Sequence, residues 1–407
     1  MKNKNRACAA ASVLGALLAT TSAFAADISD GVVKIGVLTD MSGPYADNVG
    51  AGAVLAAQMA AEDFGGKVQG VPIEIVQADH QNKADVGSAV ANKWYDTEKV
   101  DAITEVVSSA VALSVQEISK AKNKVFLATG PGTPDLTGKA CSPVGVHWAY
   151  DNYAYANVVA GATVRRGLKS WYFLTADYSF GHTLEGAATQ VIKANGGEAL
   201  GAVRAPLNST DMSSYLLQAQ GSGAQVIGIA NAGADMVNTV KQAQEFGITQ
   251  AGQSLAALLV NLPDIKSLGL ASAKDLILAD SFYWDMNDDT RKWSKRFMER
   301  SGGKAPGSLQ AAVYGAVTHY LKSIDANGSD EAKSTVAKMR EIPINDFYTK
   351  NATIRTDGRV MRDMYLFQVK TPEESKYDWD FYKLLETVPA DKAFRSQADG
   401  GCSIPAK

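Results

Sequence analysis

The side chains best suited to chemistry in this sequence lie in loops that follow predicted strands. The first predicted strand is the apolar run 32–38, which ends in the loop Thr39-Asp40-Met41-Ser42-Gly43-Pro44-Tyr45. A buried strand that runs into a Gly/Pro turn and then into a helix opens a βα unit. Ligands of open parallel sheets bind beyond the carboxyl ends of the strands. We therefore expect a binding site at this loop first.

Catalytic and cofactor-binding motifs are scarce in the chain. There is no G-x-S-x-G elbow or Walker loop, and Gly130-Pro131-Gly132 has a proline in the turn and no third glycine for a dinucleotide fingerprint. The four histidines are scattered and indicate no metal site: His80, His147, His182 and His319. We expect no enzyme, no cofactor and no metal. A Ser/His/Asp triad stays open, and turnover of a bound ester or amide would reveal it.

The composition is that of an ordinary globular protein. The 407 residues are 46% hydrophobic and 20% charged, with a net charge of -3 and a pI of about 5.9. Nothing in this balance indicates nucleic acid or an anionic membrane as a partner. The length predicts a sizeable core and two domains.

The N-terminus has the pattern of a secretory signal peptide. Basic residues precede a short apolar run, and Ala23-Phe24-Ala25 forms an A-x-A cleavage site, which predicts a mature chain from Ala26. The alternative is an uncleaved anchor, although the run is short for a bilayer and no later segment is long enough. We expect an exported, periplasmic protein.

Two cysteines remain after this cleavage, Cys141 and Cys402. A lone pair in an oxidising compartment usually forms a bridge. We predict a Cys141–Cys402 disulfide that ties the C-terminal tail to the middle of the chain; the alternative is two free thiols.

Alternating strand and helix patterns predict the fold class. After the first strand, three more strands alternate with helical segments in the first half, at 71–77, 102–107 and 125–127. A second series begins after residues 147–151, with strands at 170–175, 199–204, 225–230 and 276–279. This alternation predicts parallel sheets covered by helices on both faces.

The last part of the chain has a weaker pattern. Residues 352–355 and 364–369 predict a hairpin with Asp357-Gly358 at its turn. The tail from Thr371 onward is rich in proline and charge, and we expect little regular structure in it.

The chain resembles periplasmic solute-binding proteins of the leucine/isoleucine/valine-binding type. The resemblance rests on the exported start, on Val-Lys-Ile-Gly-Val-Leu followed by Ser-Gly-Pro, and on segments 130–137, 177–181 and 237–247. It implies two Rossmann-like lobes joined by three crossover strands, closing on a ligand and delivering it to the permease and ATPase of an ABC importer. By that analogy, residues 26–151 with 281–351 form one lobe, 152–280 with 352–390 form the other, and 391–407 form a tail tied back by the disulfide.

In this family a carboxylate ligand is held by a serine after the third strand and by the turn after the fourth. The resemblance places those roles on Ser108 or Ser109 and on Thr129, Gly130 and Gly132. A helix N-terminus offers unpaired N–H groups and a positive dipole end, and glycine lets the backbone approach an anion. The alternative is that Ser109 only caps its helix and the glycines only form a turn.

The recognition of a ligand amine departs from the family pattern. Amino-acid binders of the family use a threonine where this chain has Gly132, and a glutamate in a Gly-Pro-Glu-Gly segment whose counterpart here, residues 255–263, has no acid. A buried ammonium without a carboxylate would be costly. This argues against a branched-chain amino acid, unless Asp280 or Asp177 substitutes for the glutamate.

Aromatic residues gather at or just past the predicted strand ends: Tyr45, Trp148, Tyr150, Tyr178, Phe180, Phe282, Tyr283 and Trp284. Apolar and aromatic walls with a few placed polar groups are typical of small-molecule sites. Asn231 is a candidate hydrogen-bond partner from the second lobe, with turn formation as its alternative; core packing is the alternative for each aromatic.

We therefore predict the substrate-binding component of an ABC importer, holding a small carboxylate with an apolar or aromatic body. Two alternatives remain open. One is a branched-chain or other amino-acid-binding protein of the same family, and the other is a ligand sensor that docks on a receptor.

Overall fold

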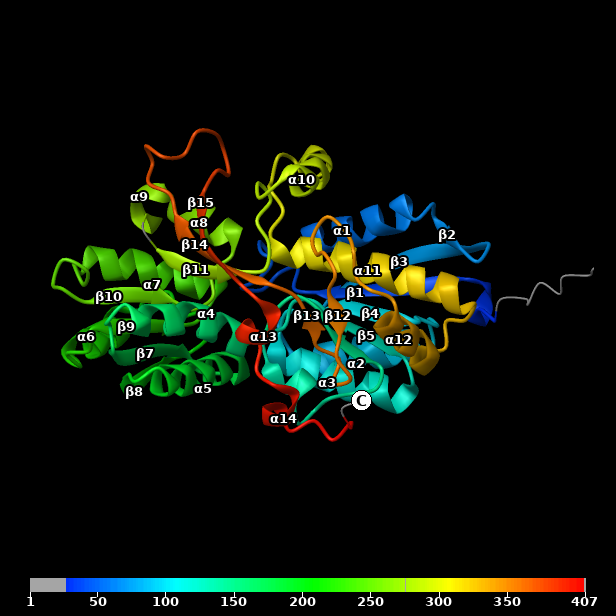
Figure 1. Cartoon of the computed structure of the whole chain (residues 1–407), viewed down its shortest axis with the longest axis horizontal. Helices are drawn as coiled ribbons and strands as arrows, with labels where there is room; N and C mark the ends of the chain where they lie inside the picture. Colours follow the sequence, from blue (N-terminus) through cyan, green and yellow to red (C-terminus); the bar gives the residue numbers. More distant parts are fainter. Residues whose placement is uncertain (1–26, 275, 406–407) are drawn as a thin grey trace, which may run out of the picture.

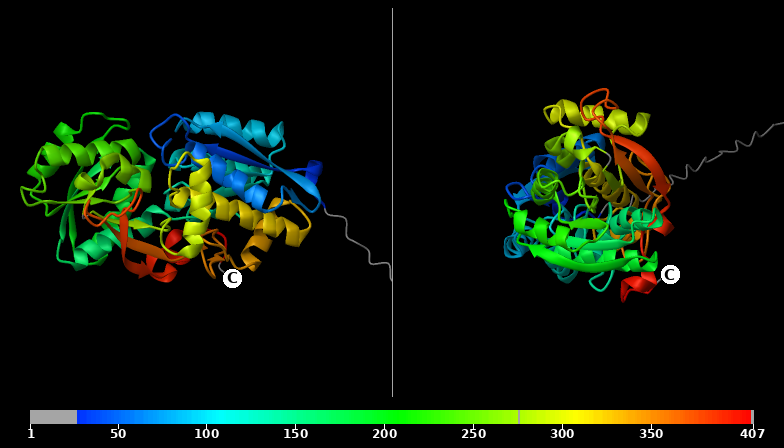
Figure 2. Two further views of the ribbon diagram at one scale, coloured as in Figure 1. Left: turned by 90° about the horizontal axis from the view of Figure 1, so that it is seen from above. Right: turned by 90° about the vertical axis from the view of Figure 1, so that its left-hand side faces the viewer.

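The computed structural model describes residues 27–274 and 276–405. They form two α/β lobes that lie side by side (Figure 1 and Figure 2). The chain passes between the lobes after β6, after β11 and after β13. Two lobes with three passages agree with the predicted type I periplasmic-binding architecture. The predicted signal peptide, residues 1–25, lies outside the described residues.

The first lobe is built on a six-stranded sheet in the order β2-β3-β1-β4-β5-β6. Its strands are parallel except β2, and their bounds are β1 Val33–Thr39, β2 Lys67–Val68, β3 Val71–Asp79, β4 Ala102–Glu105, β5 Val125–Ala128 and β6 Gly145–His147. The helices of this lobe are α1 Gly50–Asp63, α2 Ala84–Asp96, α3 Ser109–Lys122, α10 Asp288–Arg300, α11 Ser308–Asn327 and α12 Ala332–Glu341, with the 3₁₀ turns η1 Ser29–Gly31 and η2 Pro134–Thr137. The four predicted strands of this half are confirmed.

The second lobe repeats the arrangement with a parallel sheet in the order β10-β9-β7-β8. The strands are β7 Ser170–Ala176, β8 Glu198–Ala205, β9 Val226–Ala230 and β10 Ser254–Ala257. The helices are α4 Asn152–Arg165, α5 Ser179–Ala194, α6 Ser213–Gly221, α7 Gly233–Glu245, α8 Leu262–Leu268 and α9 Leu270–Ala273. The loop after β7 and the loop after β9 both face the first lobe. A ligand site is expected at these carboxyl ends of the strands.

A third, antiparallel sheet joins β11 (Ile277–Asp280), β14 (Met364–Val369) and β15 (Tyr382–Val388). This corrects two expectations. The tail beyond Thr371 contains β15, whose exposed leucines hid the alternation that marks a strand. The predicted hairpin does turn at Asp357-Gly358, but β12 (Thr353–Ile354) pairs with β13 (Val360–Met361), whereas residues 364–369 pair with β11 and β15.

The C-terminal tail runs back across the molecule through the short helices α13 (Ala390–Ala393) and α14 (Gln397–Gly400) (Figure 1). It ends in the predicted disulfide between Cys141 and Cys402, whose Cα atoms are 5.6 Å apart. Because the bridge links positions 261 residues apart, it restricts the unfolded chain strongly and stabilises the fold by about 2–5 kcal/mol.

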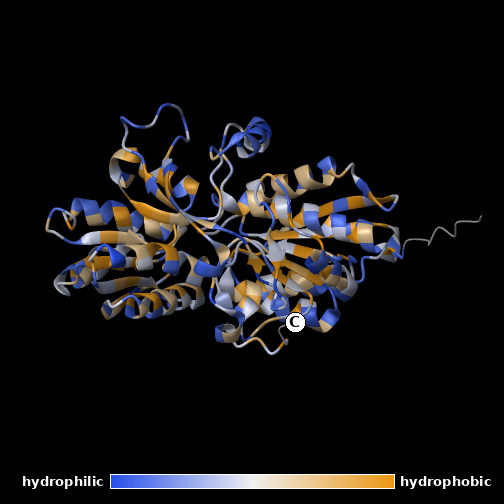
Figure 3. Ribbon diagram, viewed as in Figure 1, coloured by the Kyte–Doolittle hydropathy of each residue, from blue (hydrophilic) through white to orange (hydrophobic). Residues whose placement is uncertain are grey.

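Apolar residues concentrate in the strands and on the inner faces of the helices (Figure 3). In the first lobe, Leu38, Trp94, Ile103 and Val111 form part of one buried layer between the sheet and helices α2 and α3. No helix among residues 27–274 and 276–405 combines the length and apolar character that crossing a bilayer requires.

Two helical glycines offer a matched test of this packing. A Cβ at Gly87 in α2 would lie 2.3 Å from a methyl carbon of Val111, whereas a Cβ at Gly186 in α5 would meet nothing within 4 Å. We expect Gly87→Ala to lower the free energy of unfolding by about 1–3 kcal/mol through overpacking. Gly186→Ala should raise it by about 0.5–1 kcal/mol through helix propensity. Urea unfolding measures both, and a Gly87→Ala protein as stable as Gly186→Ala would contradict this packing.

Candidate functional site

The loop after β1 is folded by one buried carboxylate. Asp40 accepts hydrogen bonds from the backbone N–H of Gly43 at 2.8 Å and of Tyr45 at 3.1 Å. A side chain at Gly43 would place a Cβ 2.6 Å from both carboxylate oxygens, so the turn requires glycine. The result is a fixed loop that presents Tyr45 to the other lobe.

Tyr45 meets Tyr178 across the cleft. Their phenol hydroxyls are hydrogen-bonded to each other, and Tyr178 stands at the start of α5, directly after β7. Burial raises the pKa of both phenols above the ordinary value of 10, so both remain neutral. Gly233 of the second lobe packs beneath this contact, and a Cβ there would lie 2.7 Å from the carbonyl oxygen of Pro44.

A second polar contact joins the lobes beside the first. The Asn48 side-chain amide donates to the Asp264 carboxylate at 3.2 Å, and Asp264 also accepts from the backbone N–H of Asn261 at 2.8 Å. Asp264 is in the first turn of α8 and forms a capping box with Asn261. Burial raises the pKa of Asp264 to about 6.

Hydrogen bonds to three successive backbone carbonyl oxygens hold the turn after β5 in place. The Tyr150 hydroxyl donates to the carbonyl of Gly130 at 2.7 Å, and the His147 ring donates from Nε2 to that of Pro131 at 2.8 Å. The backbone N–H of Asn152 donates to the carbonyl of Gly132 at 2.6 Å. Three successive carbonyls anchored in this way fix the conformation of the turn.

The two glycines of this turn are needed for close packing. A Cβ at Gly130 would lie 2.1 Å from Oε1 of Glu105, and a Cβ at Gly132 would lie 2.2 Å from Oδ1 of Asn152. Neither contact leaves room for a larger residue, so glycine fits at both positions whether or not the turn also binds a ligand.

The connection from β4 to α3 is strained. Glu105 has φ 80° and Val106 has φ 57°, a left-handed conformation that is unfavourable for a β-branched residue. Such strain costs of order 1–3 kcal/mol per residue and is frequent at functional sites. Glu105 is completely buried, and burial raises its pKa to about 8.

Helix α3 begins immediately after this connection. Ser108 is its N-cap residue, but its side chain makes no capping hydrogen bond. The buried hydroxyls of Ser108, Ser109 and Thr129 have no hydrogen-bond partner among the residues that the structure describes. The two serine hydroxyls therefore do not cap the helix, and each can donate a hydrogen bond to an acceptor outside it.

A small cavity of about 20 Å³ remains between the lobes. Its lining comes from both lobes: Tyr45, Asn48, Val107, Gly132, Tyr150, Tyr178, Phe180, Ala232, Leu259, Asn261 and Leu309. On this scale a single water molecule needs about 10–15 Å³. The cavity in this arrangement of the lobes is therefore too small for an organic ligand.

Five of the predicted site residues line this cavity: Tyr45, Gly132, Tyr150, Tyr178 and Phe180. Ser108 is next in the chain to the lining residue Val107, and Thr129 and Gly130 belong to the same turn as Gly132. Ser108, Ser109, Thr129 and Gly130 are thus close in the chain to lining residues but do not themselves line the cavity.

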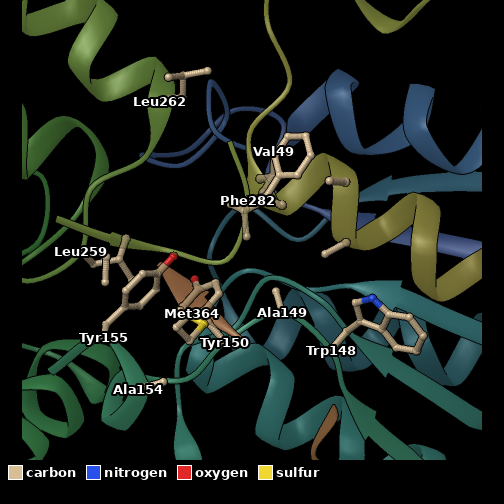
Figure 4. Packing of buried hydrophobic residues seen from close by; sticks show 14 of the residues in the cluster. Val49, Trp148, Ala149, Tyr150, Ala154, Tyr155, Leu259, Leu262, Phe282 and Met364 are labelled. Carbon is tan, nitrogen blue, oxygen red and sulfur yellow. The ribbon is translucent and has the colours of Figure 1, made fainter. Parts of the chain in front are cut away.

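The remaining four of the thirteen predicted residues do not line the cavity either, and they pack elsewhere. The Trp148 ring packs 5.7 Å from His319 and lies apart from the Tyr150 and Tyr155 rings (Figure 4). Asp280 accepts from the Tyr155 hydroxyl at 3.3 Å, and burial raises its pKa to about 7. Phe282 packs among three aromatic rings, and the Asn231 amide donates to the Thr239 hydroxyl at 2.9 Å.

The sequence reasoning missed Asp264 and several apolar lining residues. Asp264 lies one residue beyond the stretch 255–263 that was expected to match the family's acidic segment. The sequence does mark Asp264 as part of a helix start, because Asn261 is followed by Pro263 and then by this acid three residues after the asparagine. Leu259 and Leu309 carry no such signal, since a leucine beside a ligand site looks like any core leucine.

Comparison with known proteins gives the class of this two-lobed clamp. A family model described as periplasmic binding protein matches residues 32–376. A periplasmic binding protein of Burkholderia mallei is 48% identical, with a TM-score of 0.90 over 92% of this chain and 99% of that one. A branched chain amino acid ABC transporter periplasmic ligand-binding protein of Burkholderia xenovorans is 39% identical, with a TM-score of 0.82 over 91% and 99%.

The chain belongs to the periplasmic binding protein family, within the branched-chain amino acid type of ABC transporter substrate-binding proteins. The resemblance predicted from sequence is thus confirmed. A solute-binding protein of Rhodopseudomonas palustris in complex with 4-hydroxybenzoate is 22% identical, with a TM-score of 0.79 over 89% of this chain and 98% of that one. At that identity the likeness shows a shared fold only.

The raised pKa of Glu105 predicts a pH effect on stability. The folded protein holds this proton up to about pH 8, whereas an unfolded glutamate loses it near pH 4.3. The stabilising contribution is therefore complete below about pH 4 and is lost as the pH rises to 8. Glu105→Gln should gain stability relative to the wild type by more than about 1 kcal/mol between pH 5 and pH 8.

Urea unfolding at the two pH values measures this difference. Glu117→Gln, on the exposed face of α3, controls for the general effect of removing one acid. An unchanged stability difference between Glu105→Gln and the wild type at pH 5 and pH 8 would contradict the buried, protonated carboxyl.

Proposed function

We propose that this protein captures a small organic carboxylate with an apolar or aromatic body and delivers it to the permease and ATPase of an ABC importer. The proposal includes export to the periplasm through the N-terminal signal sequence. It assigns the protein no turnover of its own. One observation carries the ligand class: aromatic side chains from both lobes line the cavity, and hydroxyls without a partner lie at the start of α3, directly after the lining residue Val107 in the chain.

The apolar body of the ligand would lie against the cavity walls. Tyr45, Tyr150, Tyr178 and Phe180 supply aromatic faces, and Val107, Ala232, Leu259 and Leu309 supply aliphatic surface. Pockets of this kind gain affinity from the removal of apolar area from water, while a few polar groups set the orientation. The paired hydroxyls of Tyr45 and Tyr178 are suited to orient a polar ring substituent once they separate.

The carboxylate of the ligand would lie at the start of α3. No lysine or arginine is among the residues that line the cavity. The stabilising groups there are instead the hydroxyls of Ser108, Ser109 and Thr129 and the N-terminus of a 14-residue helix. Unpaired N–H groups and the helix dipole favour an anion at that place by about 0.3–2 kcal/mol.

One observation favours the second candidate, an amino acid. Asp264 brings a buried carboxylate to the second-lobe side of the cavity, next to Asn261 and Asn48, which line it. A ligand ammonium would find its counter-charge there. Against this, both carboxylate oxygens already accept hydrogen bonds, from the Asn48 amide and from the backbone N–H of Asn261.

Capture would proceed by a population shift between open and closed lobes. A ligand that contacts both lobes stabilises the closed form by its extra contacts there. The closed form then presents a surface made from both lobes, which is the feature that a permease can recognise. A receptor could recognise the same surface, so the transport role rests on the family and not on the clamp itself.

A thermal-shift screen of ligand-stripped protein separates the two candidates. We expect benzoate and 4-hydroxybenzoate to stabilise the protein, by about 2.7 kcal/mol at a hundred times the dissociation constant, and leucine to have no effect. Calorimetric titration then gives the affinities.

Asp264→Asn sharpens the distinction. It should leave benzoate affinity within about threefold, because a carboxylate ligand does not need this charge, whereas an amino acid that pairs with Asp264 would lose at least about tenfold. Stabilisation by leucine that is lost in Asp264→Asn would refute the carboxylate class and establish the amino-acid candidate.

A further inference from the structure

The C-terminal tail is anchored to both lobes. In the second lobe, the Asn157 side chain on α4 donates to the carbonyl oxygens of Lys392 at 2.5 Å and Ala393 at 3.3 Å. In the first lobe, Cys402 is bonded to Cys141. The tail therefore crosses between the lobes beside the three main-chain passages, as a fourth link that the disulfide closes (Figure 1).

The middle of the tail is docked on the segment around β12 and β13. The Phe394 ring is buried with the Arg359 guanidinium 4.7 Å from its centre. The Arg355 guanidinium donates to the carbonyl of Arg395 at 2.9 Å and forms an ion pair with the buried carboxylate of Asp357. These contacts hold the backbone at Arg395 in a fixed place.

From that place Arg395 reaches the start of η2, directly after the turn that follows β5. Its Nη2 donates to the carbonyl of Pro134 at 2.6 Å. A Cβ at Gly138 would lie 2.5 Å both from this Nη2 and from the carbonyl oxygen of Gly400, so the tail packs tightly here. Pro134 directly follows Thr133, the last residue of the turn whose carbonyls are anchored by Tyr150, His147 and Asn152.

We infer that the disulfide-anchored tail is a strap that positions the ligand-binding turn, with Arg395 as the positioning residue. Tyr150 and His147 of the first lobe and Asn152 at the start of α4 hold Gly130 to Gly132, and Arg395 holds Pro134, the residue directly after the turn. Because the strap is also bound to α4, lobe movement and the turn are mechanically linked. The inference rests on the proposed function for the role of the turn in binding, but its structural part stands independently.

Hydrogen exchange of the ligand-free protein tests the structural part. Arg395→Ala should speed amide exchange in peptides covering residues 129–138 by at least about tenfold, while peptides from β7 and β9 keep wild-type rates. Arg395→Lys, which retains a donor, should restore most of the protection. Gln397→Ala is the matched control, because Gln397 lies in the same tail but bonds to Thr356 and not to the turn.

The double variant Cys141→Ser/Cys402→Ser removes the strap's anchor without touching Arg395. It should speed exchange in the same peptides, and it keeps the test decisive if Arg395→Ala folds poorly. Wild-type exchange of residues 129–138 in both Arg395→Ala and the double variant would overturn the inference, as would an equal effect of Gln397→Ala.

Benzoate binding tests the link to the ligand. We expect about tenfold weaker binding in Arg395→Ala, recovery to within threefold in Arg395→Lys, and less than a twofold change in Gln397→Ala. If the wild type binds no benzoate, the proposed ligand class fails while the exchange experiment still decides on the strap. If exchange rises in Arg395→Ala but benzoate affinity does not change, the positioning role is refuted.

Discussion

The closed arrangement of the lobes depends on the contact between the Tyr45 and Tyr178 hydroxyls. The contact joins a loop fixed by the Asp40 carboxylate to the start of a helix in the other lobe, and Gly233 leaves the space for it. A hydrogen bond between neutral groups contributes only about 0.5–1.5 kcal/mol net. This contact alone is thus a weak link, and a ligand that bridges the lobes can outweigh it.

The electrostatics of the cleft set a second constraint. Glu105, Asp264 and Asp280 are buried near the site, and burial raises the pKa of each. No positively charged side chain lines the cavity to balance an anion. A carboxylate ligand must therefore rely on hydroxyl and N–H donors at the start of α3. The pKa of about 8 keeps the Glu105 carboxyl protonated at neutral pH, which removes one charge that would oppose an anion.

Local patterns in the sequence predicted the elements whose formation is local. The strands of the first lobe stand out as β-branched runs bounded by turns, and the two cysteines beyond the predicted cleavage site leave a single pairing. Pairing at long range was not predictable: β14 joins β11 from more than eighty residues earlier, and β15 is an edge strand with exposed leucines. At the site, the position of a residue at a strand end does not show in which direction its side chain points. Tyr150 lines the cavity, whereas Trp148, two residues earlier, packs on His319.

The most direct test of clamp closure is the distance between two spin labels, one on each lobe. Gln58 on α1 and Leu217 on α6 are exposed and lie far from the cleft contacts, so cysteines placed there can carry the labels. We expect a broad distribution that includes long distances in ligand-free protein and a single shorter distance with saturating benzoate. An identical distribution with and without a ligand that binds would contradict closure of the two lobes around it.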